Sequence, residues 1–155
     1  MTLRPLRPDD RDIELAFVSG LSAETRHNRL LGGAINITRE YIERLVSVDF
    51  SRNMALAATA MLDGETLLGV ARYVRDQDGD AAEFAIVVAD AWHGRGIGYR
   101  LLAKLIDAAR RHGVERLYGD ILAMNRPMLG LVSKLGFKLS RHEDATLTRA
   151  VMELR

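Results

Sequence analysis

The stretch Trp92-His93-Gly94-Arg95-Gly96-Ile97-Gly98 decides the fold, because its three glycines stand between an apolar strand and an amphipathic helix. Glycines allow backbone amides to approach a ligand closely. The first turn of the following helix adds unpaired N–H groups and the positive end of the helix dipole. The sequence therefore predicts a cradle for a phosphate or a pyrophosphate at this turn.

Two common glycine-rich motifs do not fit this stretch. A Walker A loop requires Lys followed by Ser or Thr after its last glycine, and neither follows Gly98. A dinucleotide fingerprint requires a third glycine where Tyr99 or Leu101 stands, depending on which glycine begins the motif. A tight strand-to-helix connection without a ligand is the alternative interpretation.

Outward from the turn, the hydrophobic period predicts alternating elements on both sides. Upstream, three strands at 54–61, 66–74 and 81–89 form an antiparallel meander, with a hairpin turn at Asp63-Gly64. The other expected strands span 3–6, 116–123, 137–140 and 147–154. Helices are expected from Asp9-Asp10 as N-cap to Leu21, then over 22–31, 38–46, 98–112 and 127–135, with the apolar stripes of the last two in the core. The predicted fold class is α/β (α+β), with a mixed central sheet of about six to seven strands flanked by helices, an antiparallel N-terminal half and a parallel crossover.

Composition limits the function classes. The 155 residues predict a single domain over 1–155, and 48% hydrophobic with 28% charged residues is typical of a globular protein. A net charge of +1 argues against nucleic acid or an anionic membrane as partner. The chain has no cysteine, so disulfides, thiolate metal sites and a cysteine nucleophile are excluded. No apolar run reaches the length of a spanning helix and the N-terminus has no secretory pattern, so we expect a cytoplasmic protein.

Four segments together resemble the acetyl-CoA-binding core of the GCN5-related N-acetyltransferases (GNAT superfamily). They are Val87-Val88, the turn His93–Gly98, the helix start Tyr99-Arg100-Leu101-Leu102 and the tail Lys134-Leu135-Gly136-Phe137. The resemblance covers 82–137 specifically and agrees with the element order of the whole chain. Within the superfamily, 20–26, 82–86 and 125–129 look most like the acetyltransferase domain of bacterial protein-lysine acetyltransferases.

The resemblance implies acetyl-CoA as cosubstrate and assigns its contacts. The turn amides of Gly94, Arg95, Gly96, Ile97 and Gly98 would hold the pyrophosphate, flanked by His93 and Tyr99. The strand backbone at Ile86, Val87 and Val88 would pair with the pantetheine arm, and an amide near Val88 would stabilise the oxyanion. Asn125 would contact the pantetheine or the acetyl end, besides serving as a helix N-cap. The family usually has Gln or Arg at the position of His93, which leaves the side-chain contact at this position open.

Glu83 is the candidate general base. An amine must lose a proton before it attacks a thioester, and a carboxylate can take that proton directly or through one water. Strand alternation places Glu83 on the same face as Ala85 and Val87, where a charge requires a reason. In the protein acetyltransferases that the chain resembles, a glutamate at the matching position is the proposed base. An ordinary solvated or Arg-paired glutamate is the alternative.

The general acid of the family is missing from this sequence. Many members have a tyrosine in the pattern Leu-Tyr-x-Lys-Leu-Gly-Phe, and this chain has Val132 at that position. Tyr118, Ser133 and water remain as proton donors to the departing thiolate. The histidines show no metal-ligand spacing, so we expect no metal.

These observations predict an acetyl-CoA-dependent N-acetyltransferase that acts by direct transfer in a ternary complex. The expected acceptor is a primary amine, preferably a protein lysine. A small-molecule amine acetyltransferase and a non-catalytic acyl-CoA-binding regulatory module are the alternatives. The sequence leaves open whether the chain forms a homodimer and whether a separate polypeptide regulates it.

Overall fold

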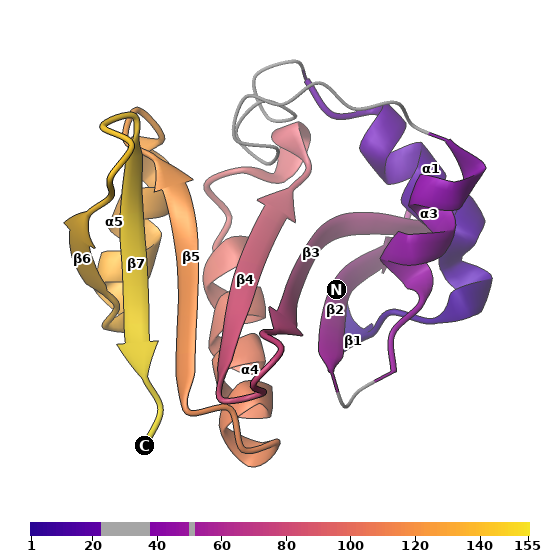
Figure 1. Cartoon of the computed structure of the whole chain (residues 1–155). Coiled ribbons are helices and arrows are strands. Elements are labelled where there is room, and N and C mark those ends of the chain that lie inside the picture. Colours follow the sequence, from indigo (N-terminus) through magenta and orange to yellow (C-terminus); the bar gives the residue numbers. More distant parts are fainter. Residues whose placement is uncertain (23–37, 50–51) are drawn as a thin grey trace.

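One mixed β-sheet organises the molecule (Figure 1). The computed structural model describes residues 1–22, 38–49 and 52–155. Within these residues, seven strands form a sheet in the order β1-β2-β3-β4-β5-β7-β6. The strands are β1 (Thr2–Pro5), β2 (Asn53–Met61), β3 (Glu65–Arg75), β4 (Ala81–Val88), β5 (Arg116–Leu122), β6 (Lys138–Arg141) and β7 (Leu147–Glu153). The helices are α1 (Arg11–Ser19), α3 (Arg39–Val46), α4 (Ile97–Arg111) and α5 (Arg126–Leu135), with short 3₁₀ helices at Pro8–Asp10 and Asp90–Trp92.

The strand directions confirm the predicted α/β arrangement. Strands β1 to β4 pair with one another in antiparallel fashion, and the β2–β3 hairpin turns at Asp63-Gly64 as expected. The chain then crosses through α4 to β5, which runs parallel to β4. Strand β7 lies between β5 and β6 and is antiparallel to both. Among the strands that the structure describes, the only parallel pair is therefore β4 and β5, and the crossover that connects them begins at the glycine turn.

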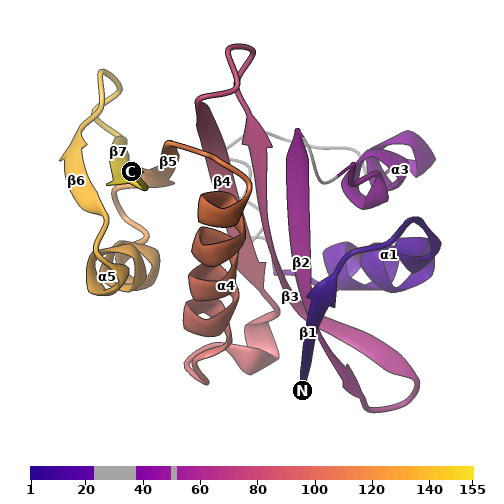
Figure 2. The same ribbon diagram turned by 90° about the horizontal axis from the view of Figure 1, so that it is seen from below.

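The helices cover the two faces of the sheet separately (Figure 2). Helices α4 and α5 pack on one face, and α1 and α3 pack on the other, each with its own group of buried side chains. Helix α4 is held by an apolar stripe of buried residues: Ile97, Leu101, Leu102, Leu105, Ile106 and Ala109. This stripe is the one predicted from the helical period, so local sequence decides which side of α4 meets the sheet.

The predicted N-cap at Asp9-Asp10 is correct in position but not in the bond that its side chain makes. Asp10 is the N-cap residue of α1, but its side chain makes no hydrogen bond to the helix. Its carboxylate accepts from both terminal nitrogens of Arg4 at 2.8 and 2.9 Å and from the Arg7 amide at 2.7 Å. Burial opposes ionisation of this 4%-exposed residue, but the Arg4 guanidinium holds the pKa of Asp10 below its ordinary value. The ion pair thus ties the start of the helix to β1.

Two other helices have side-chain N-caps, of which the one at Asn125 was predicted. The Thr38 hydroxyl accepts from the Tyr41 amide at 3.1 Å, and the Asn125 side chain accepts from the Met128 amide at 3.4 Å. The helix predicted over 22–31 lies outside the described residues. Among the helices that the structure does describe, none has the length and apolar character needed to cross a membrane.

Candidate active site

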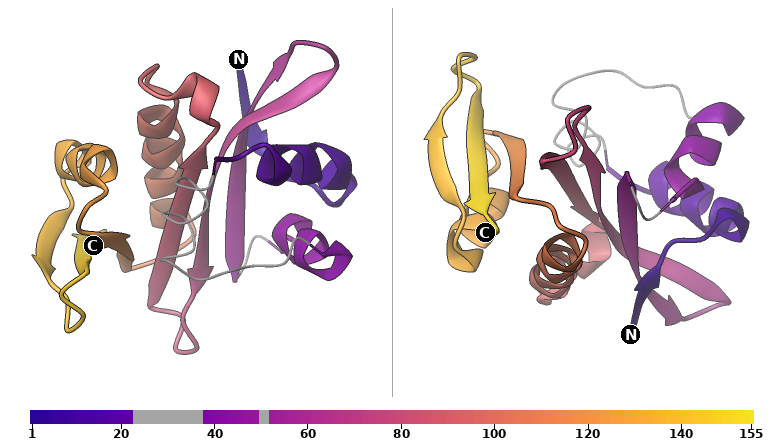
Figure 3. Two further views of the ribbon diagram at one scale, coloured as in Figure 1. Left: turned by 90° about the horizontal axis from the view of Figure 1, so that it is seen from above. Right: turned by 60° about the horizontal axis from the view of Figure 1, so that its bottom comes forward.

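Strands β4 and β5 separate after a short paired segment (Figures 1 and 3). In the part of the chain that the structure describes, their parallel pairing joins only Ala81–Glu83 to Arg116–Tyr118. The next residue of β4 is Phe84, whose ring lies against Gly119 so closely that a Cβ on Gly119 would come within 2.7 Å of it. The ring also packs 5.0 Å from that of Phe137. Phe84 therefore acts as a wedge at the point where the strands part.

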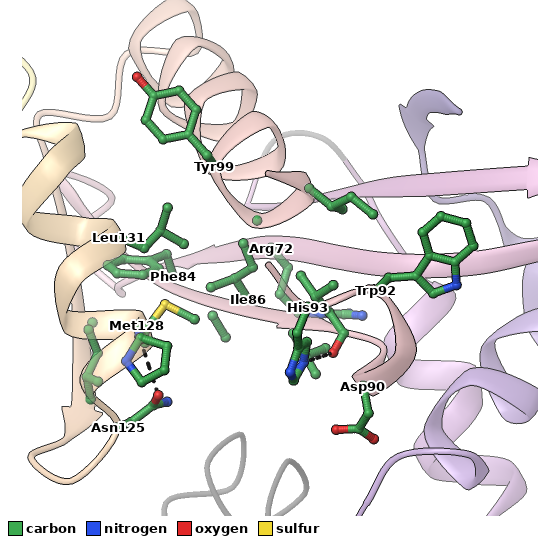
Figure 4. A pocket seen from close by; sticks show the side chains of 18 of the residues that line it. Arg72, Phe84, Ile86, Asp90, Trp92, His93, Tyr99, Asn125, Met128 and Leu131 are labelled. Atoms are coloured by element: carbon green, nitrogen blue, oxygen red, sulfur yellow. Dashed lines mark hydrogen bonds between the residues drawn. The ribbon is translucent and has the colours of Figure 1, made fainter. Parts of the chain in front are cut away.

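A cavity of about 890 Å³ occupies the space beyond this wedge (Figure 4). Its walls come from the separated parts of β4 and β5, the start of α4 and the first turns of α5. Its size lies in the range of small-molecule and cofactor sites. Among the described residues, the lining includes Glu83, Ile86, Val87, Val88, His93, Gly94, Gly96, Ile97, Gly98, Tyr99 and Asn125. The structure thus brings together all the site residues predicted from the sequence except Arg95.

The glycine turn presents backbone amides at one end of the cavity. Gly94 and Gly96 have φ of 75° and 80°, a left-handed conformation that side-chain-bearing residues rarely adopt. Gly96 is the N-cap of α4, and the helix has no side-chain cap. The first amides of α4 have no carbonyl one turn earlier to accept from them, so they can bind an anion.

Gly98 permits close packing of the same turn against β4 and α5. A Cβ there would lie 3.3 Å from a methyl of Leu131 and 3.7 Å from one of Val88. Arg95 is not part of the lining, and its guanidinium lies 4.7 Å from the centre of the ring of Trp92, which does line the cavity. Arg95 can therefore contribute its backbone amide to the turn while its side chain stacks on Trp92.

The edge of β4 offers polar backbone groups to the cavity. The Ala89 amide donates to the Leu68 carbonyl on β3 at 2.7 Å. Because backbone groups alternate along a strand, those of Phe84, Ile86 and Val88 face the other way, toward the separated β5. His93 Nε2 lies 2.7 Å from the Val88 carbonyl oxygen. Since a carbonyl only accepts, Nε2 carries the proton and donates, and His93 closes this end of the edge.

Apolar side chains from β4 and α5 form a wall of the cavity (Figure 4). Phe84, Ile86, Met128 and Leu131 all line the cavity. The apolar stripe of α5 was expected to be core, and its members do pack against the core, but two of them also line the cavity. Val132 is fully buried, whereas Met128 and Leu131 are half-buried and face the cavity. A helical stripe looks the same in sequence whether it meets a core or a ligand cavity.

Acidic groups gather at the other end, around Glu83. Removal of water by the surrounding protein raises the pKa of Glu83, and the charges of Asp120 and Asp76 raise it further, while Arg149 opposes them. Tyr118 donates to Asp76 Oδ1 at 2.9 Å. Burial and this hydrogen bond raise the pKa of Tyr118 to about 12, and the residue is not part of the lining. Neither property suits a proton donor in the cavity.

Several lining residues were not predicted. Asp90, at the start of the short helix after β4, accepts from the Ser22 amide at 2.8 Å, which connects the end of α1 to the cavity. Asp120 was not predicted either, although a carboxylate next to the apolar end of a strand could have indicated a functional residue. In the described ranges, the structure has no group of three or more His, Asp or Glu that could hold a metal ion.

Comparisons with known proteins place this geometry among acetyltransferases. The sequence profile described as "Acetyltransferase (GNAT) family" matches residues 33–137. Acetyltransferase PA5475 of Pseudomonas aeruginosa is 36% identical over 143 residues, which cover 92% of this chain and 77% of the relative. The crystal structure of the GNAT domain of S. lividans PAT is 26% identical with a TM-score of 0.89, covering 97% of this chain and 89% of the other.

A third neighbour is similar in fold. YncA of Salmonella typhimurium, solved with its cofactor acetyl-CoA, has a TM-score of 0.75 at 23% identity, covering 100% of this chain and 94% of the other. At this identity the similarity concerns the arrangement of the sheet and helices.

Proposed function

This chain belongs to the acetyltransferase (GNAT) family, and we propose that it transfers the acetyl group of acetyl-CoA directly to a primary amine, a protein lysine, with Glu83 as general base. One observation carries the proposal: a single cavity holds the glycine turn at one end and Glu83 at the other. Between them run the unpaired edge of β4 and an apolar wall. This order suits a donor with a charged diphosphate, an extended amide-containing arm and a reactive thioester.

Acetyl-CoA fits the cavity in one direction. Its pyrophosphate accepts from the amides of the turn at Gly94–Gly98, with the positive end of α4 behind them. The pantetheine arm lies along β4 and pairs with backbone groups of Ile86 and Val88, as an added strand would. The Val88 carbonyl already accepts from His93, so its amide is the group left for the arm or the oxyanion. Asn125 caps α5 and borders the same space.

The transfer requires two protons to leave the acceptor ammonium. Glu83 takes the first, and the free amine attacks the thioester carbonyl carbon to form the C–N bond. The tetrahedral intermediate collapses, the C–S bond breaks, and the second proton leaves for sulfur or water. A base whose pKa is raised toward the working pH accepts such a proton more effectively, so the partial burial of Glu83 and the negative charges of Asp120 and Asp76 favour this role.

The thiolate departs without a tyrosine acid. Val132, at the position where many relatives have that tyrosine, is fully buried among core residues. Ser133 is not part of the lining, and the Tyr118 hydroxyl is bound to Asp76. The thiol of coenzyme A leaves as an anion of moderate basicity, because a thiol pKa near about 8.5 makes it a fair leaving group.

A protein lysine is the acceptor that the Glu83 end favours. Among the described residues there, Glu83 and its neighbour Ala85 are exposed, and Val74, the cross-strand partner of Glu83, is 53% exposed. A base on an open sheet surface can be reached by a side chain that projects from another protein. The high structural similarity to the GNAT domain of a PAT protein supports the same acceptor class.

Labelled acetyl-CoA tests the proposal. The protein is incubated with the label and with cell lysate fractionated by size, and we expect label in the protein fraction. Glu83→Gln should lower kcat/KM by about 10²- to 10⁴-fold, the range of general base catalysis. Its acetyl-CoA affinity, measured by calorimetry, should not change. Glu153→Gln, on the exposed end of β7, is the matched control and should retain activity.

The outcomes separate the alternatives. Label only in small molecules would replace the protein lysine by a small amine. Binding of acetyl-CoA without transfer to any amine would favour a regulatory module. Full activity in Glu83→Gln would remove Glu83 as the base while leaving the cofactor site intact.

A further inference from the structure

We propose that Asp120, held in place by Arg149 and His142, is a positioning residue that sets the proton affinity of Glu83 from the neighbouring strand. The inference rests on the proposed role of Glu83 and names a second residue for the same reaction. Asp120 does not accept the proton itself. It places a fixed negative charge beside the group that does.

Strand register puts the two carboxylates on one face. Glu83 on β4 pairs with Tyr118 on β5, and neighbouring residues of paired strands point to the same side of the sheet. Asp120 follows Tyr118 by two residues, so alternation returns it to that side, and both Glu83 and Asp120 line the cavity. Because the strands separate after this pair, Asp120 faces the opening next to Glu83 rather than a continuous sheet.

Asp120 is fixed by two basic side chains. Its direct cross-strand partner on β7 is Arg149, which donates from Nε to Oδ1 at 2.8 Å and from Nη2 to Oδ2 at 3.0 Å. His142, after β6, places Nε2 3.3 Å from Oδ2. The Asp120 side chain is 12% exposed. The bidentate Arg149 contact holds the pKa of Asp120 below its ordinary value, and His142 adds to this effect, so Asp120 stays ionised while Glu83 titrates.

Other charged groups around Glu83 also affect its pKa. Asp76, at the turn after β3, acts in the same direction as Asp120, and Arg149 acts against both. Arg72 on β3 lines the cavity too, but its guanidinium donates to the Leu45 carbonyl at 2.9 Å and lies 3.6 Å from Glu14. The described groups around Glu83 are therefore Asp76 and Arg72 from the β3 side, Tyr118 and Asp120 from β5, and Arg149 from β7, while His142 from the β6–β7 turn contacts Asp120.

The sign of the effect follows from charge. A negative neighbour disfavours a second negative charge, so Asp120 makes Glu83 a stronger base. Asp120→Asn removes this charge and leaves Arg149 and His142 without their anion. Both changes favour ionised Glu83. The acidic limb of kcat/KM should therefore move to lower pH, and the plateau should fall because a weaker base accepts the proton less effectively.

The test is the pH profile of kcat/KM for the whole chain. At pH values on the acidic limb, we expect Asp120→Asn to retain a larger fraction of its own plateau kcat/KM than wild type does. On the plateau, its kcat/KM should be lower than that of wild type. A simple folding defect lowers kcat/KM without moving the limb. Glu153→Gln is the matched control. Glu153 pairs with Arg116 across the same two strands at 2.7 Å, outside the cavity lining, and its removal should leave the limb in place.

A second variant keeps the inference testable if Asp120→Asn does not fold. Arg149→Gln removes the opposing positive charge, so the limb should move to higher pH. If both variants fold and neither moves the limb, or if both move it in the same direction, the proposed role of Asp120 is wrong. Glu83→Gln separates the two proposals: its full activity would overturn the base, whereas its inactivity with an unmoved limb in Asp120→Asn overturns only the positioning role.

Discussion

The two ends of the β4–β5 pair differ although they belong to the same strands. At the closed end, Ala82 and Leu117 are completely buried and the backbones are paired. At the open end, one residue beyond Glu83, the Phe84 ring lies against Gly119 and the strands separate. Backbone groups that hold the sheet together at the closed end become groups that can bind a ligand at the open end. The contact between Phe84 and Gly119 thus marks the boundary between a paired part of the sheet and a part that can form a binding site.

The largest effect on this comparison is expected at the closed end. Leu117→Ala should lower the free energy of unfolding by about 2–5 kcal/mol, because Leu117 has no exposure and its loss leaves a cavity. Leu131→Ala, at the half-buried wall of the open end, is the matched variant. It should cost less stability and weaken acetyl-CoA binding. Urea unfolding and calorimetry measure both, and equal stability losses would contradict the distinction.

Tyr118→Phe tests the last paired position between β4 and β5, and its effect on the free energy of unfolding should depend on pH. Loss of the hydrogen bond to Asp76 should cost about 1.5–3 kcal/mol of unfolding free energy at pH 8. The folded-state pKa of about 12 exceeds the ordinary value of 10.0, so this stabilisation is complete below pH 10 and is lost as the pH rises through 12. In urea unfolding, the difference between wild type and variant should therefore shrink from pH 10 upward. A constant difference would show that folding does not raise the pKa of Tyr118.

Gly119→Ala tests the wedge itself. The added methyl would meet the Phe84 ring at 2.7 Å, so the ring must move. Overpacking of this kind should cost about 1–3 kcal/mol of unfolding free energy. Because Phe84 also lines the cavity, the acetyl-CoA affinity should change as well. Gly130→Ala is the control, because an added Cβ there meets nothing within 4 Å; as a Gly-to-Ala change inside α5 it should raise the free energy of unfolding by about 0.5–1 kcal/mol and leave the acetyl-CoA affinity unchanged.

The smallest effect is expected at the glycine turn, where function should respond more than stability. Gly96→Ala and Gly113→Ala both place a side chain at φ 80°, at opposite ends of α4, and each should cost about 1–2 kcal/mol. Only Gly96→Ala should weaken acetyl-CoA binding, because Gly113 lies outside the cavity lining. Thermal unfolding and calorimetry test the pair. Equal acetyl-CoA affinity in the two variants would show that the turn at Gly96 does not bind the diphosphate.

Local signals in the sequence were sufficient for most of the fold. The helical stripe of α4, the hairpin at Asp63-Gly64 and the helix that begins after Thr38 all agree with the structure. Each depends on the period of apolar residues or on the conformation of one residue type, which neighbours in the chain decide. The glycine turn was predictable for the same reason.

The failures have one physical cause. The Asp10 side chain binds Arg4 on β1 rather than an amide of α1, and two members of the α5 stripe line a cavity as well as packing against the core. In both cases the chemical character of the residue was interpreted correctly, but the group that its side chain contacts was not predicted. A carboxylate accepts from any donor, and an apolar side chain packs against any apolar surface, so neither selects its partner through local sequence.

The sequence by itself determined the elements, the α/β class and the amide cradle between an apolar strand and α4, because short-range sterics and periodicity specify them. Only the tertiary structure decided that Phe84 meets Gly119, that β4 and β5 part beyond Glu83, and that Asp120, Arg149 and His142 meet from three segments. These contacts depend on the register of non-adjacent strands, which is fixed by the packing of the whole sheet rather than by any one stretch of chain.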